Sequence, residues 1–116
     1  MFEKGPGIQR VIEESVPGKQ VTIAHIIASP VAGLYESLGL EEGGAIGILT
    51  LSPYETAMIA ADYAVKSANV EIGFLDRFTG SVVVTGDVLS VETALQCVSE
   101  MLKDKLGFIV TGVTRT

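Results

Sequence analysis

Apolar residues follow two kinds of pattern along the chain, and the first predicts β-strands. Residues 21–28 are β-branched and almost wholly apolar, which is typical of a strand buried on both faces. Similar apolar runs at 45–51, 70–75 and 81–86 predict three more strands. Residues 76–80 join the last two at hairpin length, so these two strands are expected to be antiparallel neighbours.

The second pattern has helical spacing. Residues 31–38 predict a short helix that ends at Gly39. A longer helix is expected to reach residue 67 and to begin in a capping box, with Ser52 as cap, Pro53 at the first position and Glu55 closing the box. Its alanines form a smooth face that allows close packing.

The last helix carries the strongest amphipathic stripe, with apolar residues recurring at intervals of three and four. Asp87 or Ser90 is expected to cap it, and Gly107 to end it. Residues 108–113 predict either a terminal strand or an extended tail. The stripe consists of Val91, Ala94, Leu95, Val98 and Leu102.

The predicted order β-α-β-α-β-β-α indicates an α+β domain, with consecutive strands packed under helices on one side. Residues 1–7 are interpreted as a flexible lead, and 8–116 as a single domain. The segment 8–16 is ambiguous, because its apolar residues fit one face of a helix slightly better than one face of a strand.

Composition excludes several classes of function. The 116 residues carry a net charge of −6 without a basic stripe, which argues against nucleic-acid binding. No apolar stretch approaches the roughly 20 residues of a membrane-spanning helix, and we expect no signal peptide. A lone cysteine fits the cytoplasm. Apolar residues make up 47% of the chain, a surplus that predicts a partner interface.

The chain offers little material for catalysis, and we expect no catalytic, cofactor or metal site. His25, the one histidine, lies within an apolar strand without a nucleophile or ligand cluster nearby in the sequence. Cys97 is expected to be a buried, inert thiol. The glycine-rich stretch 43–47 precedes a strand, whereas a dinucleotide loop follows a strand and opens a helix.

Three longer stretches resemble circularly permuted shell proteins of bacterial microcompartments, of the propanediol- and ethanolamine-utilisation type. They are residues 17–25, 62–71 and 72–80, and 45–50 is similar as well. In the common shell subunit the strand VTIAHIIASP would come last, whereas here it comes first. The resemblance therefore implies a circularly permuted BMC-domain fold, with a four-stranded antiparallel sheet flanked by helices and an extra N-terminal β segment.

The function implied by the resemblance is structural. A homo-hexamer would tile with other microcompartment shell proteins into a shell in the cytoplasm, and encapsulated enzymes could dock through targeting peptides. The alternative is a small-molecule-binding regulatory domain of similar α+β layout. Such a domain would bind a metabolite at a subunit cleft.

The resemblance also assigns roles to residues. Lys66 matches the lysine at the hexamer edge, and Ser29 stands where the common subunit has an edge arginine. Residues at the hairpin tip and in the N-terminal segment would lie near the six-fold axis, the first set as a pore ring and the second as a β-barrel. They are Asp76, Arg77 and Phe78 for the pore, and Ile8, Arg10, Ile12, Glu14 and Val16 for the barrel.

Overall fold

The structure is a computed structural model that describes residues 18–116. The expectations for the lead 1–7 and for the barrel segment 8–16, with Ile8, Arg10, Ile12, Glu14 and Val16, lie outside the described residues.

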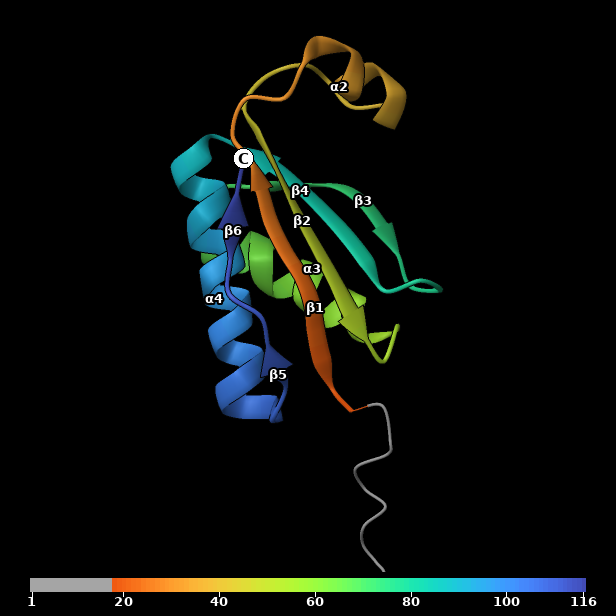
Figure 1. The fold of residues 1–116 in the computed structure, drawn as a ribbon, viewed down its shortest axis with the longest axis vertical. Coiled ribbons are helices and arrows are strands. Elements are labelled where there is room, and N and C mark those ends of the chain that lie inside the picture. Colours follow the sequence, from red (N-terminus) through yellow and green to blue (C-terminus); the bar gives the residue numbers. More distant parts are fainter. Residues whose placement is uncertain (1–17) are drawn as a thin grey trace, which may run out of the picture.

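Four antiparallel strands form the main sheet, as the apolar runs predict (Figure 1). Their order is β3-β4-β2-β1, so the hairpin β3–β4 occupies one side of the sheet. Two short strands, β5 and β6, extend the other side and run parallel to β1. The bounds are β1 (Gln20–Ile27), β2 (Ala45–Ser52), β3 (Glu71–Asp76), β4 (Ser81–Gly86), β5 (Ile109–Val110) and β6 (Thr114–Arg115).

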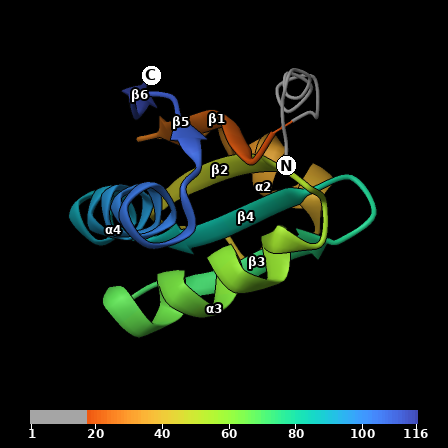
Figure 2. The same ribbon diagram turned by 90° about the horizontal axis from the view of Figure 1, so that it is seen from below.

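Two helices, α3 (Thr56–Ser67) and α4 (Val88–Leu106), pack on one face of the sheet and against each other (Figure 2). The predicted stripe of α4 faces this core, and so do four alanines of α3. Gly47 lets α4 approach β2, because a Cβ there would lie 2.7 Å from Cγ1 of Val91. The core is therefore a layer of strand residues under two helices.

The short helix α2 (Ala32–Leu38) departs from the prediction that all helices lie on one side. Its Tyr35 packs with Ile46 and Val83, and these two strand residues alternate with those that face α3 and α4. Alternating strand residues point to opposite faces, so α2 covers one end of the other face of the sheet.

The glycine and aspartate signals at helix ends are confirmed. Gly39 and Gly107 follow α2 and α4 with φ of 72° and 73°, a left-handed conformation that glycine adopts at low cost. Asp87 caps α4 by accepting the N–H of Ser90 at 2.9 Å.

The predicted capping box before α3 is wrong. Strand β2 extends through Ser52, and the helix begins only at Thr56, after a turn. Glu55 occupies the cap position and makes no side-chain cap hydrogen bond. The hydroxyl of Thr56 instead donates to the carbonyl oxygen of Pro53 at 2.6 Å.

The C-terminal segment after α4 closes the outer edge of β1. The N–H of Ile109 donates to the carbonyl of Lys19 at 2.9 Å, and the N–H of Thr116 donates to the carbonyl of Ile26 at 2.8 Å. The ammonium group of Lys19 also donates to the carbonyl of Leu106 at 3.0 Å. The start of β1 thus lies beside the end of α4, although the two are far apart in sequence.

Candidate functional site

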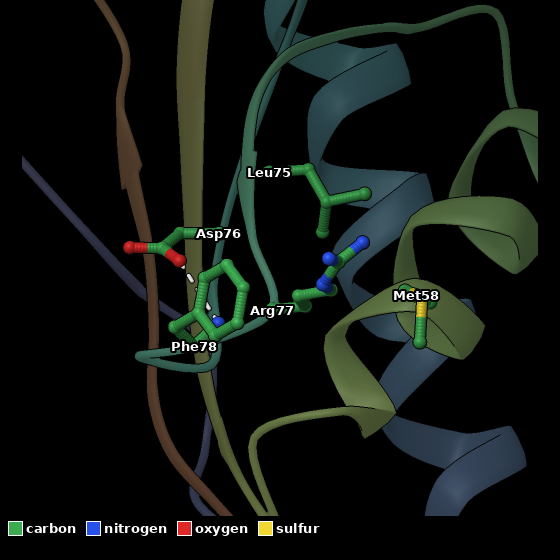
Figure 3. Close-up of a pocket in the computed structure, with 5 residues that line it drawn as sticks. All are labelled: Met58, Leu75, Asp76, Arg77 and Phe78. Carbon is green, nitrogen blue, oxygen red and sulfur yellow. Dashed lines mark hydrogen bonds between the residues drawn. The ribbon is translucent and has the colours of Figure 1, made fainter.

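The tip of the β3–β4 hairpin and the start of α3 enclose an open cavity of about 300 Å³ (Figure 3). It is lined by Met58, Leu75, Asp76, Arg77 and Phe78. Three of these residues are the ones that the family resemblance assigns to a pore. The fold brings them together with two apolar side chains from the neighbouring strand and helix.

The carboxylate of Asp76 is used within the hairpin tip. Its Oδ1 accepts the N–H of Phe78 and its Oδ2 accepts the hydroxyl of Thr79, both at 2.9 Å. These bonds, the Phe78 N–H foremost, hold the pKa of Asp76 below its ordinary value because they favour the charged form. Asp76 therefore stabilises the turn, because its carboxylate accepts hydrogen bonds from donors within the same hairpin tip.

Arg77 and Phe78 are the groups that the tip presents outward. The guanidinium carbon of Arg77 lies 4.8 Å from the centre of the Phe78 ring, which is cation–π distance. Phe78 is 72% exposed, and Met58 and Leu75 beside it are 46% and 39% exposed. The cavity therefore combines apolar walls with one cation.

One strongly exposed apolar side chain lies on the other side of the molecule. Ile109 of β5 is 70% exposed, and the sheet order places β5 and β3 at opposite edges. A head-to-tail contact between identical copies joins two different surfaces of the molecule, and these opposite edges of the sheet differ in this way.

Lys66 and Ser29, the two residues expected at a hexamer edge, are both exposed. Neither of them lines the cavity at the hairpin tip. Lys66 forms an ion pair with Asp62 one helical turn earlier, at 2.7 Å between Nζ and Oδ2. Ser29 follows β1 in the connection to α2. Both side chains can contact another molecule.

Neither His25 nor Cys97 lies in a catalytic arrangement within residues 18–116. The ring nitrogens of His25 contact the hydroxyls of Thr114 and Thr116, and Cys97 is half-buried rather than fully buried as expected. No group of three potential metal ligands occurs in the described part of the chain. None of the helices in that part is long and apolar enough to cross a membrane.

Sequence patterns missed the apolar side of the site. Met58 lies on α3 outside its buried alanine face, and a large apolar residue beside a stripe of small ones was the available signal. Ile109 belongs to a two-residue strand that has no periodicity of its own.

The sequence is similar to known proteins along most of its length. Residues 45–113 match the family model of the BMC domain. The chain is 53% identical over 116 residues to the bacterial microcompartment shell protein CutR of Streptococcus intermedius, covering 100% of both chains. It is 54% identical to the shell protein PduU of Salmonella typhimurium, covering 99% of this chain and 100% of that one.

Among solved structures, form 1 of the CutR flat hexamer has a similar fold. It superposes with a TM-score of 0.85 at 53% identity, over 92% of this chain and 99% of the other. The family match begins at β2 and leaves β1 and α2 before it.

Proposed function

The chain belongs to the BMC-domain family of bacterial microcompartment shell proteins, and from this premise we propose that its copies close into six-membered rings that tile the shell. The observation that carries the proposal is the likeness to a flat hexamer of a relative over nearly the whole of both chains. The protein is a structural shell subunit and not an enzyme, as its relatives are shell proteins by name.

It is a circularly permuted member of the family. Strand β1 and helix α2 precede the matched residues 45–113, and the start of β1 lies beside the end of α4. Permutation of this kind preserves the fold because the joined ends were already neighbours at the surface.

The ring contact in this proposal joins the hairpin cavity of one copy to the β5 edge of the next. Met58 and Leu75 are exposed at the first surface and Ile109 at the second. Burying apolar area contributes about 25 cal/mol per Å², so these side chains favour contact over exposure to water. A heterologous contact closes into a ring when its rotation is one sixth of a turn.

The hairpin tip would then face the six-fold axis, and this part of the proposal refines the expected pore ring. Asp76 is occupied by its own turn, so Arg77 and Phe78 would line the axis as cations beside aromatic rings. A ring of such groups favours passage of small anions over cations. The axial barrel expected of segment 8–16 lies outside the described residues and stays a prediction.

Contacts between rings would involve Lys66 and Ser29. The stem of Lys66 can pack along a neighbouring ring while its charge remains in water. A serine at position 29 lacks the reach of an arginine, which would weaken the contact between rings. Docking of targeting peptides from encapsulated enzymes remains a prediction.

Native mass spectrometry tests the ring. We expect a main species of six times the 12.2 kDa chain mass. Replacing Leu75 with Arg would place a charge in the proposed contact and shift the protein to monomers. Val31→Arg is the matched control, because Val31 is more exposed than Leu75 but lies before α2. Monomers in the unmodified protein, or rings in Leu75→Arg, would count against the proposal.

A further inference from the structure

A second groove lies between α4 and the C-terminal segment, away from the hairpin cavity. Its volume is about 310 Å³, and it is lined by residues of α4 and of the stretch 110–113. Residues 111–113 connect β5 to β6 and belong to neither strand. The groove shares β5 with the proposed ring contact through Val110, and its other lining residues lie on α4 and in the stretch 111–113.

Ser99 lies in this groove with an unsatisfied hydroxyl. The residue is 6% exposed, and its Oγ has no hydrogen-bond partner among the described residues. A buried hydroxyl without a partner destabilises the folded state, and few such groups occur in native proteins. Alanine would fit the same position without this cost, so the hydroxyl calls for a partner that the described residues do not supply.

Three of the other polar side chains in the groove can donate hydrogen bonds, and two of these, Gln96 and Thr111, can also accept them. Gln96 and Lys103 lie one turn before and one turn after Ser99 on α4, and they share its side of the helix. Thr111 lines the groove from the C-terminal segment. Glu100 is the one acidic residue that lines this groove. It also lines a neighbouring groove, together with Lys105. An acceptor with negative charge suits this set.

Val110 and Val113 supply an apolar wall, since both are partly buried against the core. The volume is at the lower end of the range for small-molecule sites. We propose that the groove binds a small organic carboxylate with a short alkyl chain. Lys103 and the Ser99 hydroxyl hold the carboxylate, and the alkyl chain lies along the valines.

The ligand reaches the hydroxyl through residues 111–113. The Ser99 oxygen is closed off from solvent in the structure, so contact requires a local opening. This stretch is not paired with β1, unlike the residues on either side of it, which makes it the part of the segment that opens at least cost.

Saturation-transfer difference NMR on the full assembled protein tests the proposal with sodium butyrate as the probe. We expect saturation of the butyrate methyl and methylene protons. The signal falls at least fivefold in Ser99→Ala and in Lys103→Met, while Lys105→Met, in the neighbouring groove, is the matched control and retains it. Butan-1-ol and butylammonium give weaker signals than butyrate.

Thermal denaturation provides an independent readout. Ser99→Ala removes an unsatisfied hydroxyl, so we expect an unchanged or higher Tm together with the loss of binding. No butyrate signal in the unmodified protein, equal signals in Ser99→Ala, or a preference for butylammonium would each overturn the proposal. Dissociation of the rings in Ser99→Ala or Lys103→Met would also overturn it, because the occupant would then be another copy of the chain.

Discussion

His25 and Thr114 are 89 residues apart in the chain, yet the Nδ1 atom of the imidazole lies 2.6 Å from the threonine hydroxyl. The other ring nitrogen lies 2.9 Å from the hydroxyl of Thr116. The one histidine thus fastens the C-terminal strand β6 to β1, which explains a polar ring within an apolar strand without invoking catalysis.

Replacing His25 with Phe should loosen β6 while the main sheet remains intact. The variant keeps a ring of similar size but loses both contacts, each worth about 1 kcal/mol. Hydrogen exchange at the amides of residues 114–116 should become roughly 30-fold faster, since about 2 kcal/mol is lost in total. Thr22→Val is the control, since it removes a hydrogen bond to Thr50 on the other side of β1. Unchanged exchange in residues 114–116 would show that the imidazole does not hold the strand.

Replacing Gly80 with Ala should destabilise the hairpin. Gly80 has a φ of 78°, and an added Cβ would lie 2.2 Å from the carbonyl oxygen of Leu51. Strain of this kind costs about 1–3 kcal/mol before the clash is counted. Thermal denaturation at matched chain concentration should show a lower Tm. Gly33→Ala is the control, because an added Cβ there meets open space within a helix and should leave stability unchanged or raise it.

Stability should fall in acid partly because of Asp76 and Asp87. Hydrogen bonds to each carboxylate lower its pKa below the ordinary 3.8, from the Phe78 N–H for Asp76 and from the Ser90 N–H for Asp87. A lowered folded-state pKa contributes stability above the unfolded value, and this contribution is lost as the pH falls through the folded-state value.

The double variant Asp76→Asn, Asp87→Asn should therefore lose less stability than the unmodified protein between neutral pH and pH values below 3.8. Asparagine can still accept the backbone N–H in both turns, but it does not titrate. Urea unfolding across this range is the measurement. Identical pH dependence in the two proteins would assign the acid sensitivity to other carboxylates.

Lys66→Ala should leave the rings intact and reduce their tiling. The ion pair with Asp62 is exposed at both ends and contributes little to folding, so Tm should hardly change. Electron microscopy should show single rings in place of extended sheets. Lys105→Ala, an exposed lysine on α4, is the control for lost charge. Sheets of undiminished extent in Lys66→Ala would remove this lysine from the contact between rings.

The four main strands were predictable from sequence because each is an apolar run of strand length, even in β3, which lies at the sheet edge with most side chains exposed. The start of α3 was not, since the signals of Ser52 and Glu55 suit a cap but β2 extends through Ser52 and a turn follows. Strand β6 has two residues, and its conformation depends on pairing with β1 rather than on its own pattern.

The site was predictable only in part. The hairpin residues 76–78 could be singled out by resemblance, whereas Met58 joins them through the packing of α3 beside β3. The unsatisfied hydroxyl of Ser99 has no sequence signature, because the same serine could have bonded to a carbonyl one turn earlier in its helix.

The proximity of Lys19 to Leu106 has a consequence for how quickly the protein folds. If α4 led directly into β1, the central pairing of β1 with β2 would join the two ends of the chain. In the present order Ile27 pairs with Ile46 across one short helix, so the middle of the sheet forms from neighbouring segments. Short sequence separation between partners favours fast folding. We therefore expect β1 and β2 to pair early in folding, which would shorten the time for which their apolar edges are open to aggregation.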